Sequence, residues 1–131
     1  LVAHRTMVER QWGRIVLLSS PVPPGIGIRG HMAFSSASSG IEGLTKSLAL
    51  ELGPFNITVN CICPDFFDTE MTRKAARGEG LYMDDLHRIL VPQIPLRRLG
   101  RPEELAELVL FLSSERAGFI TGQVIHIKVG P

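Results

Sequence analysis

The segment from residue 34 to residue 52, FSSASSGIEGLTKSLALEL, constrains the fold more than any other. Apolar residues recur in it at spacings of three and four: Ile41, Leu44, Leu48 and Leu52. This pattern predicts a helix with one buried face. Gly53-Pro54 is expected to end the helix, because glycine can adopt the left-handed cap and proline cannot continue the hydrogen-bond ladder. Small residues fill the first turns, so a second backbone, a cofactor or another helix can approach closely.

Three short apolar runs, at residues 15–20, 56–63 and 122–127, read as buried strands. A second helix is predicted from Pro102 to about residue 114, since proline suits the first helical position and two carboxylates follow it. Further helical patterns occupy residues 1–12 and, around a glycine-bearing break, residues 70–92. The alternation of strands and helices predicts an α/β domain with a parallel sheet and right-handed crossovers, formed by residues 1–131 as one unit.

The composition excludes several classes of function. The chain has 131 residues, of which 44% are hydrophobic and 21% charged, and its net charge of +1 disfavours nucleic acid or a membrane surface as a partner. No apolar run reaches the roughly 18 residues of a membrane span. Cys61 and Cys63 stand two apart in a predicted strand, so we expect buried, reduced thiols and a cytoplasmic location. A start at Leu1 favours a processed, truncated or partly built polypeptide.

The helix at residues 34–52 resembles the active-site helix of short-chain dehydrogenases/reductases, which typically reads YSASK followed by a glycine and GLTKSLALEL. GRIVLLSS resembles the strand that delivers the catalytic Ser, and NITVNCICPDFFDTEMT the segment beside the nicotinamide. Residues 95–127 are similar to the closing helix and strand. The resemblance implies a partial Rossmann-like, doubly wound parallel sheet of about three strands with flanking helices, which lacks the N-terminal nucleotide-binding half.

The resemblance also assigns the catalytic positions. The catalytic Tyr corresponds to Phe34, the Lys one turn later to Ser38, and the Ser to Ser20. A phenyl ring has no exchangeable proton, and the loss of the Tyr hydroxyl as a general acid lowers the reaction rate by a factor on the order of 10²–10⁴. The Ser38 hydroxyl carries no charge that could shift the pKa of a neighbouring group. Ser20 is left as a substrate-orienting hydroxyl or an ordinary loop residue, at a spacing from Phe34 about one residue longer than usual.

NAD or NADP is the cofactor that the resemblance implies. Four residues match positions beside the nicotinamide: Pro64, Asp65, Phe67 and Thr69. Asp65, however, replaces the glycine of the family and adds a negative charge, and no Gly-rich pyrophosphate turn follows a strand. The glycines of residues 25–30 lie in the loop before the active-site helix, and we interpret them as loop residues rather than as a phosphate-binding turn. The sequence therefore disfavours real cofactor binding.

No metal site is expected, because the four histidines lack metal-ligand spacing and have no Cys or carboxylate at suitable intervals: His4, His31, His87 and His126. Arg97, Arg98 and Arg101 could bind a phosphate but are interpreted as a solvated surface cluster.

Three functional hypotheses remain. The first is a truncated or degenerate short-chain dehydrogenase/reductase relative without independent catalysis. The second is an interaction module, a homo-oligomer or a complex with a chain that supplies the missing half, which uses the helix at residues 34–52 and the exposed edge of the strand at residues 15–20. The third is an active NAD(P)-dependent carbonyl or alcohol oxidoreductase whose sequence as printed is incomplete or misread. The pattern identifies no small-molecule substrate.

Overall fold

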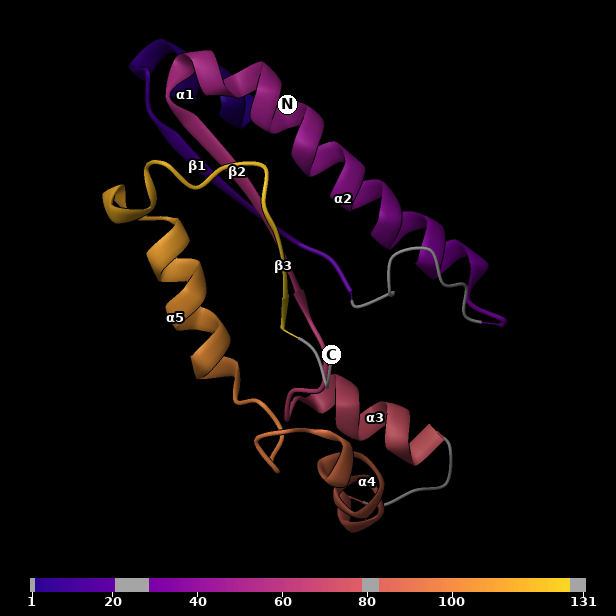
Figure 1. The fold of residues 1–131 in the computed structure, drawn as a ribbon. Coiled ribbons are helices and arrows are strands. Elements are labelled where there is room, and N and C mark those ends of the chain that lie inside the picture. Colours follow the sequence, from indigo (N-terminus) through magenta and orange to yellow (C-terminus); the bar gives the residue numbers. More distant parts are fainter. Residues whose placement is uncertain (1, 21–28, 79–82, 128–131) are drawn as a thin grey trace.

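The computed structural model describes residues 2–20, 29–78 and 83–127, and Figure 1 shows their arrangement. Within these ranges, strands β1 (Gly13–Leu18), β2 (Ile57–Pro64) and β3 (Val124–Ile127) form one parallel sheet in the order β1-β2-β3. The sheet confirms the predicted α/β class and the three predicted strands. Most of the glycine-rich loop at residues 25–30, and most of the predicted break at residues 78–80, lie outside the described residues.

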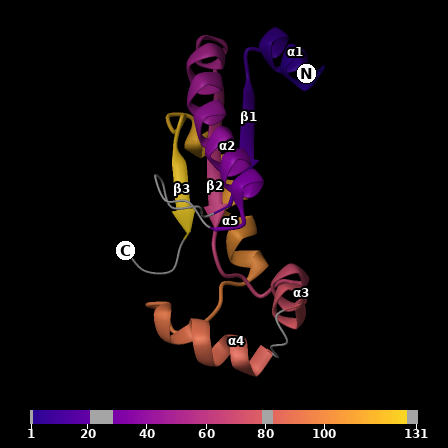
Figure 2. The same cartoon turned by 90° about the vertical axis from the view of Figure 1, so that its right-hand side faces the viewer.

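Helices cover both faces of the sheet. Helix α2 (Met32–Leu52) lies on one face and α5 (Pro102–Leu112) on the other, while α1 (Val2–Arg10) precedes β1 (Figure 1). Helices α3 (Glu70–Gly78) and α4 (Met83–Leu90) lie beyond the carboxyl end of β2 (Figure 2). Short 3₁₀ turns follow α2, α4 and α5 at Gly53–Phe55, Val91–Gln93 and Glu115–Ala117. Within the described ranges, no helix combines the length and the apolar character needed to cross a bilayer.

Strand β2 is the centre of the core, and alternate residues of it face opposite layers. Ile57 and Val59 pack in one apolar cluster with Ala49 and Leu52 of α2. Ile62 packs in a second cluster with Leu112 and Ala117, on the α5 side. Odd-numbered residues of β2 therefore face α2 and even-numbered residues face α5. This alternation decides which polar side chains of β2 lie on the α2 side of the sheet and which lie on the α5 side.

The predicted buried face of α2 is wrong in one position, because Leu44 is 49% exposed. The residues of α2 that are buried are Ser38, Thr45, Ala49 and Leu52. Small side chains let the helix approach β2 closely, and a leucine at position 44 then lies to the side of the contact.

Two local predictions also need correction. Gly53 adopts a right-handed conformation with φ −54°, and Asn56 is the residue with left-handed geometry, at φ 58°. Pro54 fits the intervening 3₁₀ turn, which moves the left-handed position three residues on. In α4, the spacing of Leu86, Ile89 and Leu90 predicts one apolar face, but Ile89 is 45% exposed.

Candidate functional site

The carboxyl ends of the three strands meet at one edge of the sheet, where ligands of open α/β proteins bind. Ser19 follows β1 there and joins its neighbours by two hydrogen bonds. Its backbone N–H donates to the Ile62 carbonyl at 2.9 Å, and its hydroxyl donates to the Ser38 carbonyl at 3.2 Å. Ser19 thus fastens the end of β1 to α2. The adjacent Ser20, the residue singled out from the sequence, is partly buried.

The positions that the resemblance assigns to the catalytic Tyr and Lys lie one helical turn apart at the start of α2. Phe34 is in the first turn, 47% exposed, with its ring edge-on to His31 at 6.2 Å between centroids. Ser38 is 5% exposed. Sequence reasoning predicted both placements on the helix but missed Ser19, because the end of a short strand cannot be fixed to one residue by pattern alone.

The residues expected beside a nicotinamide form a turn after β2, and this turn is stabilised by hydrogen bonds and packing within the protein. The Asp65 N–H donates to the Ile127 carbonyl at 2.8 Å, which ties the turn to the end of β3. Phe67 is buried and packs over Gly100, where an added Cβ would lie 2.7 Å from the Phe67 ring. Pro64 ends β2 and is partly buried.

The Thr69 hydroxyl is fully engaged as a donor. The Thr72 hydroxyl donates its proton to the Phe67 carbonyl at 2.7 Å, so the 3.0 Å contact between the two threonine hydroxyls is donated by Thr69. The Thr72 backbone N–H donates to the Thr69 oxygen at 3.2 Å. Thr69 is therefore the N-cap of α3, and its proton is not available to a ligand.

A pocket of about 320 Å³ opens beside this turn. Its lining is mainly apolar and comes from residues 65–67, 94–96 and the end of β3, together with Arg98, Gly100 and Glu104. The Arg98 guanidinium binds both carboxylate oxygens of Glu104, at 2.7 and 2.5 Å. Arg98, with the Arg101 N–H second, lowers the pKa of Glu104 to about 2. Arg98 is therefore already paired with a carboxylate, which disfavours phosphate binding there.

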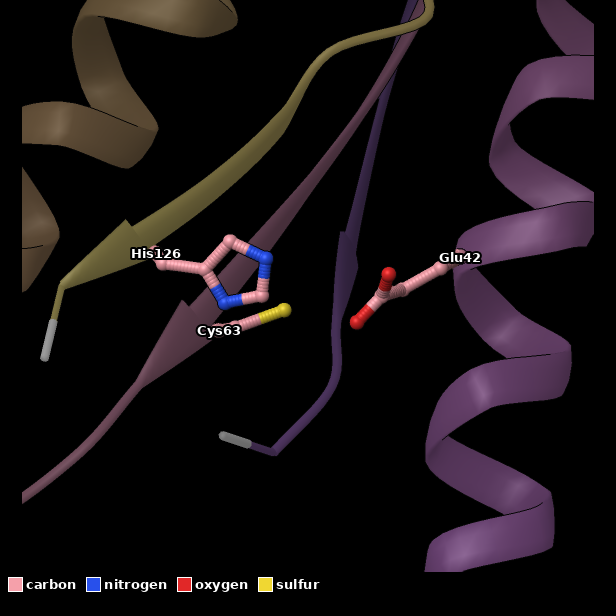
Figure 3. A group of neighbouring side chains, drawn as sticks. All are labelled: Glu42, Cys63 and His126. Carbon is pink, nitrogen blue, oxygen red and sulfur yellow. The ribbon is translucent and has the colours of Figure 1, made fainter. Parts of the chain in front are cut away.

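Three metal-ligand side chains meet on the α2 side of the sheet. Glu42 of α2, Cys63 of β2 and His126 of β3 place one ligand atom each within 4.8 Å of the others (Figure 3). Both cysteines are buried, as the strand pattern predicted, and both are free in the structure, with their sulfurs 3.9 Å apart. Burial, followed by Cys61, raises the pKa of Cys63 to about 12. His126 has no suitable Cys or carboxylate along the sequence but has both in space.

A three-stranded parallel sheet with helices on both faces, and with its turns gathered at the carboxyl edge, defines a doubly wound α/β protein. A family model described as enoyl-(acyl carrier protein) reductase matches residues 2–131. The chain belongs to the short-chain dehydrogenase/reductase family, as the resemblance of its helix at residues 34–52 indicated.

Individual relatives agree with this assignment. The chain is 44% identical over 126 residues to a 3-oxoacyl-[acyl-carrier-protein] reductase of Aquifex aeolicus, covering 96% of this chain and 48% of that protein. It is also 44% identical, over 124 residues, to an acetoacetyl-CoA reductase of Rhizobium meliloti, covering 95% and 48%. The solved structure of a short chain dehydrogenase family protein from Francisella tularensis matches with a TM-score of 0.75 at 36% identity, covering 86% and 48%. The chain thus spans about half the length of the curated relatives it matches.

Proposed function

We propose that this chain is a short-chain dehydrogenase/reductase relative that does not catalyse hydride transfer on its own. One observation carries the proposal: helix α2 keeps the frame of the active-site helix, but it presents a phenyl ring at position 34 and a buried hydroxyl at position 38. Reduction of a carbonyl requires a proton donor beside the substrate oxygen, and Phe34 supplies none. Ser38 is short and 5% exposed, so it replaces neither the reach nor the charge of a lysine.

Two polar groups on the α2 side of the sheet do not replace the missing acid. The Ser19 hydroxyl contacts α2, but its proton is directed at the Ser38 carbonyl. Cys63 is buried, and its pKa of about 12 opposes proton exchange near neutral pH. The proposal therefore does not depend on Phe34 alone.

The residues that would meet a nicotinamide do not fit it. The family resemblance implies NAD or NADP, whose carboxamide needs hydrogen-bond partners at the turn after β2. The Thr69 proton is used within the protein, and the Asp65 N–H is bonded to β3. Asp65 also brings a partly buried side chain and a negative charge where the family has glycine. We propose that neither cofactor binds this chain specifically.

The test uses the purified chain, after intact mass spectrometry has established a mass near 14.4 kDa. NADH and NADPH are titrated by fluorescence, and their oxidation is followed with acetoacetyl-CoA and a 3-oxoacyl thioester, chosen from the names of the relatives. We expect no saturable binding and no turnover above a buffer control. Saturable binding with turnover would overturn the proposal, and a mass near double this value would favour an active, longer enzyme.

A second function, that of an interaction module, is favoured by the apolar side chains that α2 and β1 leave exposed. Leu50 of α2 is 81% exposed, and Leu44 of the same helix is 49% exposed. At the end of β1, Leu18 is 57% exposed, and in the described part of the chain no strand pairs with the outer edge of β1. Such an edge is a site for strand addition. We propose pairing with a second copy or with a chain that supplies further strands.

Light scattering at micromolar concentration tests this second proposal, with Leu50→Glu as the disrupting variant. The matched control is Leu110→Glu, since Leu110 is similarly exposed, at 64%, but lies on α5 at the opposite face. We expect an oligomer that Leu50→Glu weakens and Leu110→Glu does not. A monomeric wild-type chain, or equal effects of both variants, would contradict it.

A further inference from the structure

We propose that Glu42, Cys63 and His126 form a binding site for a divalent transition metal, with Zn²⁺ as the expected occupant. The three side chains come from α2, β2 and β3 and point toward one another (Figure 3). The site depends on neither nicotinamide nor the position of Phe34, so it can fail or succeed independently of the functions proposed above.

The fold fixes two of the ligands rigidly. Cys63 and His126 are register partners on adjacent parallel strands, so their side chains leave the sheet side by side on the same face. That face is the one covered by α2, because Ile57 and Val59, at the same parity as Cys63, pack against that helix. The backbone of the sheet therefore places the side chains of Cys63 and His126 next to each other on this face.

Glu42 supplies the third ligand from the helix above. It lies four residues after buried Ser38 and three before buried Thr45, within the stripe of α2 that faces the sheet. Its carboxylate is partly buried, as is the His126 ring. Among the described residues, neither group has a hydrogen bond or ion pair that would otherwise explain its position.

The donor set fits zinc. Thiolate sulfur, imidazole nitrogen and carboxylate oxygen are the three ligand types that Zn²⁺ takes in proteins, whereas Mg²⁺ and Ca²⁺ prefer oxygen alone. Bond lengths to zinc imply ligand atoms roughly 3.5 Å apart in a tetrahedral site. Because the three ligand atoms lie within 4.8 Å of one another, closing to a tetrahedral site requires a contraction of at most about 1.3 Å, within the reach of glutamate rotamers. Three protein ligands leave the fourth position open to water or another ligand.

A thiol loses its proton when it binds a metal, and a dication stabilises the resulting thiolate. The reaction balances as one Zn²⁺ taken up and one thiol proton released to solvent, with no change of oxidation state. Cys61 lies outside the group of three and is not a ligand.

Cobalt substitution tests the site in the metal-free protein. Co²⁺ bound by a thiolate produces a sulfur-to-metal charge-transfer band, and Zn²⁺ should displace it while Mg²⁺ should not. We expect Cys63→Ser to abolish the band, and Glu42→Gln and His126→Gln each to weaken Co²⁺ binding by more than the roughly 10–100-fold that losing an outer-shell partner of a ligand costs. The matched controls, Cys61→Ser for the thiol and His87→Gln for the imidazole, should leave both the band and the affinity unchanged.

The outcomes that overturn the proposal are equally defined. They are the absence of a charge-transfer band in folded wild-type protein, a band lost in Cys61→Ser but kept in Cys63→Ser, and displacement by Mg²⁺ as effective as by Zn²⁺. Circular dichroism verifies that each variant folds. If Cys63→Ser does not fold, Glu42→Gln decides, because this side chain is only partly buried and its truncation removes no apolar contact. Unchanged Co²⁺ affinity in that variant would refute the site.

Discussion

Asn60 joins the centre of the sheet to the loop that leads into β3, and its replacement should be among the most destabilising changes in the chain. The side chain is 1% exposed and lies on the α5 face of β2. Its amide nitrogen donates to the Ile120 carbonyl at 2.7 Å, and its oxygen accepts the Gln123 N–H at 3.1 Å. Asn60→Ala removes both hydrogen bonds at once and leaves two backbone groups without these partners.

The magnitude follows from the surroundings of these groups. Each neutral hydrogen bond contributes about 1 kcal/mol net, and a stranded buried group costs about 1–3 kcal/mol. Ile120 is partly buried and Gln123 exposed, so water satisfies the stranded groups in part. We therefore expect Asn60→Ala to lower the free energy of unfolding by about 2–4 kcal/mol. The urea midpoint should fall by about 1–2 M, since m is about 1–3 kcal/mol/M for small proteins.

Urea unfolding, followed by circular dichroism and by the fluorescence of the single tryptophan, Trp12, measures this change. The control is Thr58→Val, on the same strand and face, whose buried hydroxyl has no partner among the described residues. Replacing that hydroxyl by a methyl group should leave the free energy of unfolding within about 0.5 kcal/mol or raise it. A loss below about 0.5 kcal/mol in Asn60→Ala, or an equal loss in both variants, would refute the reasoning.

Three further changes test other parts of the fold. Arg98 is the main cause that lowers the pKa of Glu104 from 4.5 to about 2. The ionised Glu104 therefore stabilises the fold above pH 4.5, and this contribution is lost as the pH falls toward 2. Denaturation midpoints measured across this pH range should depend less on pH in Glu104→Gln than in the wild-type chain. Leu112→Ala, at a position 1% exposed, should lower the free energy of unfolding by about 2–5 kcal/mol, whereas Leu110→Ala, at a position 64% exposed, should change it by less than about 0.5 kcal/mol in the same urea titration. Because Cys63 is fully buried, its alkylation in metal-free protein should require unfolding, and mass spectrometry after iodoacetamide treatment should find modification mainly above the urea midpoint; rapid modification of the native chain would contradict this.

Hydrophobic periodicity was sufficient to predict the architecture because each element of this fold buries a face. The segment at residues 34–52 reads as a helix since its apolar spacing matches one turn, and the observed helix begins two residues earlier, at Met32. Pro102 was correctly predicted as the first residue of α5, because the missing N–H of proline costs nothing at the first helical position. The continuous apolar run of β2 indicated a strand covered on both faces, and seven of its eight residues are buried.

Contacts between elements could not be predicted in the same way. The proximity of Cys63 and His126 depends on the register of two strands separated by 59 intervening positions, and no local pattern records that register. Glu42 was missed for a related reason, since a carboxylate in a helix is ordinarily assigned to the solvent side. Ser19 and Ser20 differ by a single position, yet the side chains of successive residues in extended backbone point to opposite faces, so an uncertainty of one residue changes which hydroxyl reaches α2.

The structure explains how α2 keeps its place with Phe34 and Ser38 at the positions that the resemblance assigns to a catalytic Tyr and Lys. The side chains of α2 that pack on β2 include Thr45, Ala49 and Leu52, all on turns after the reactive positions, so the contact that holds the helix does not depend on what position 34 carries. Position 34 projects into a partly exposed region, where phenyl and phenol are nearly equivalent for packing. Position 38 is different, because there the fold buries the residue and uses its carbonyl to receive Ser19. This hydrogen bond uses the backbone carbonyl of residue 38, so a serine side chain at the position that the resemblance assigns to lysine is compatible with the junction between β1 and α2. Scaffold and chemistry are therefore separable in this chain, and the persistence of the family fold is no evidence for persistence of the reaction.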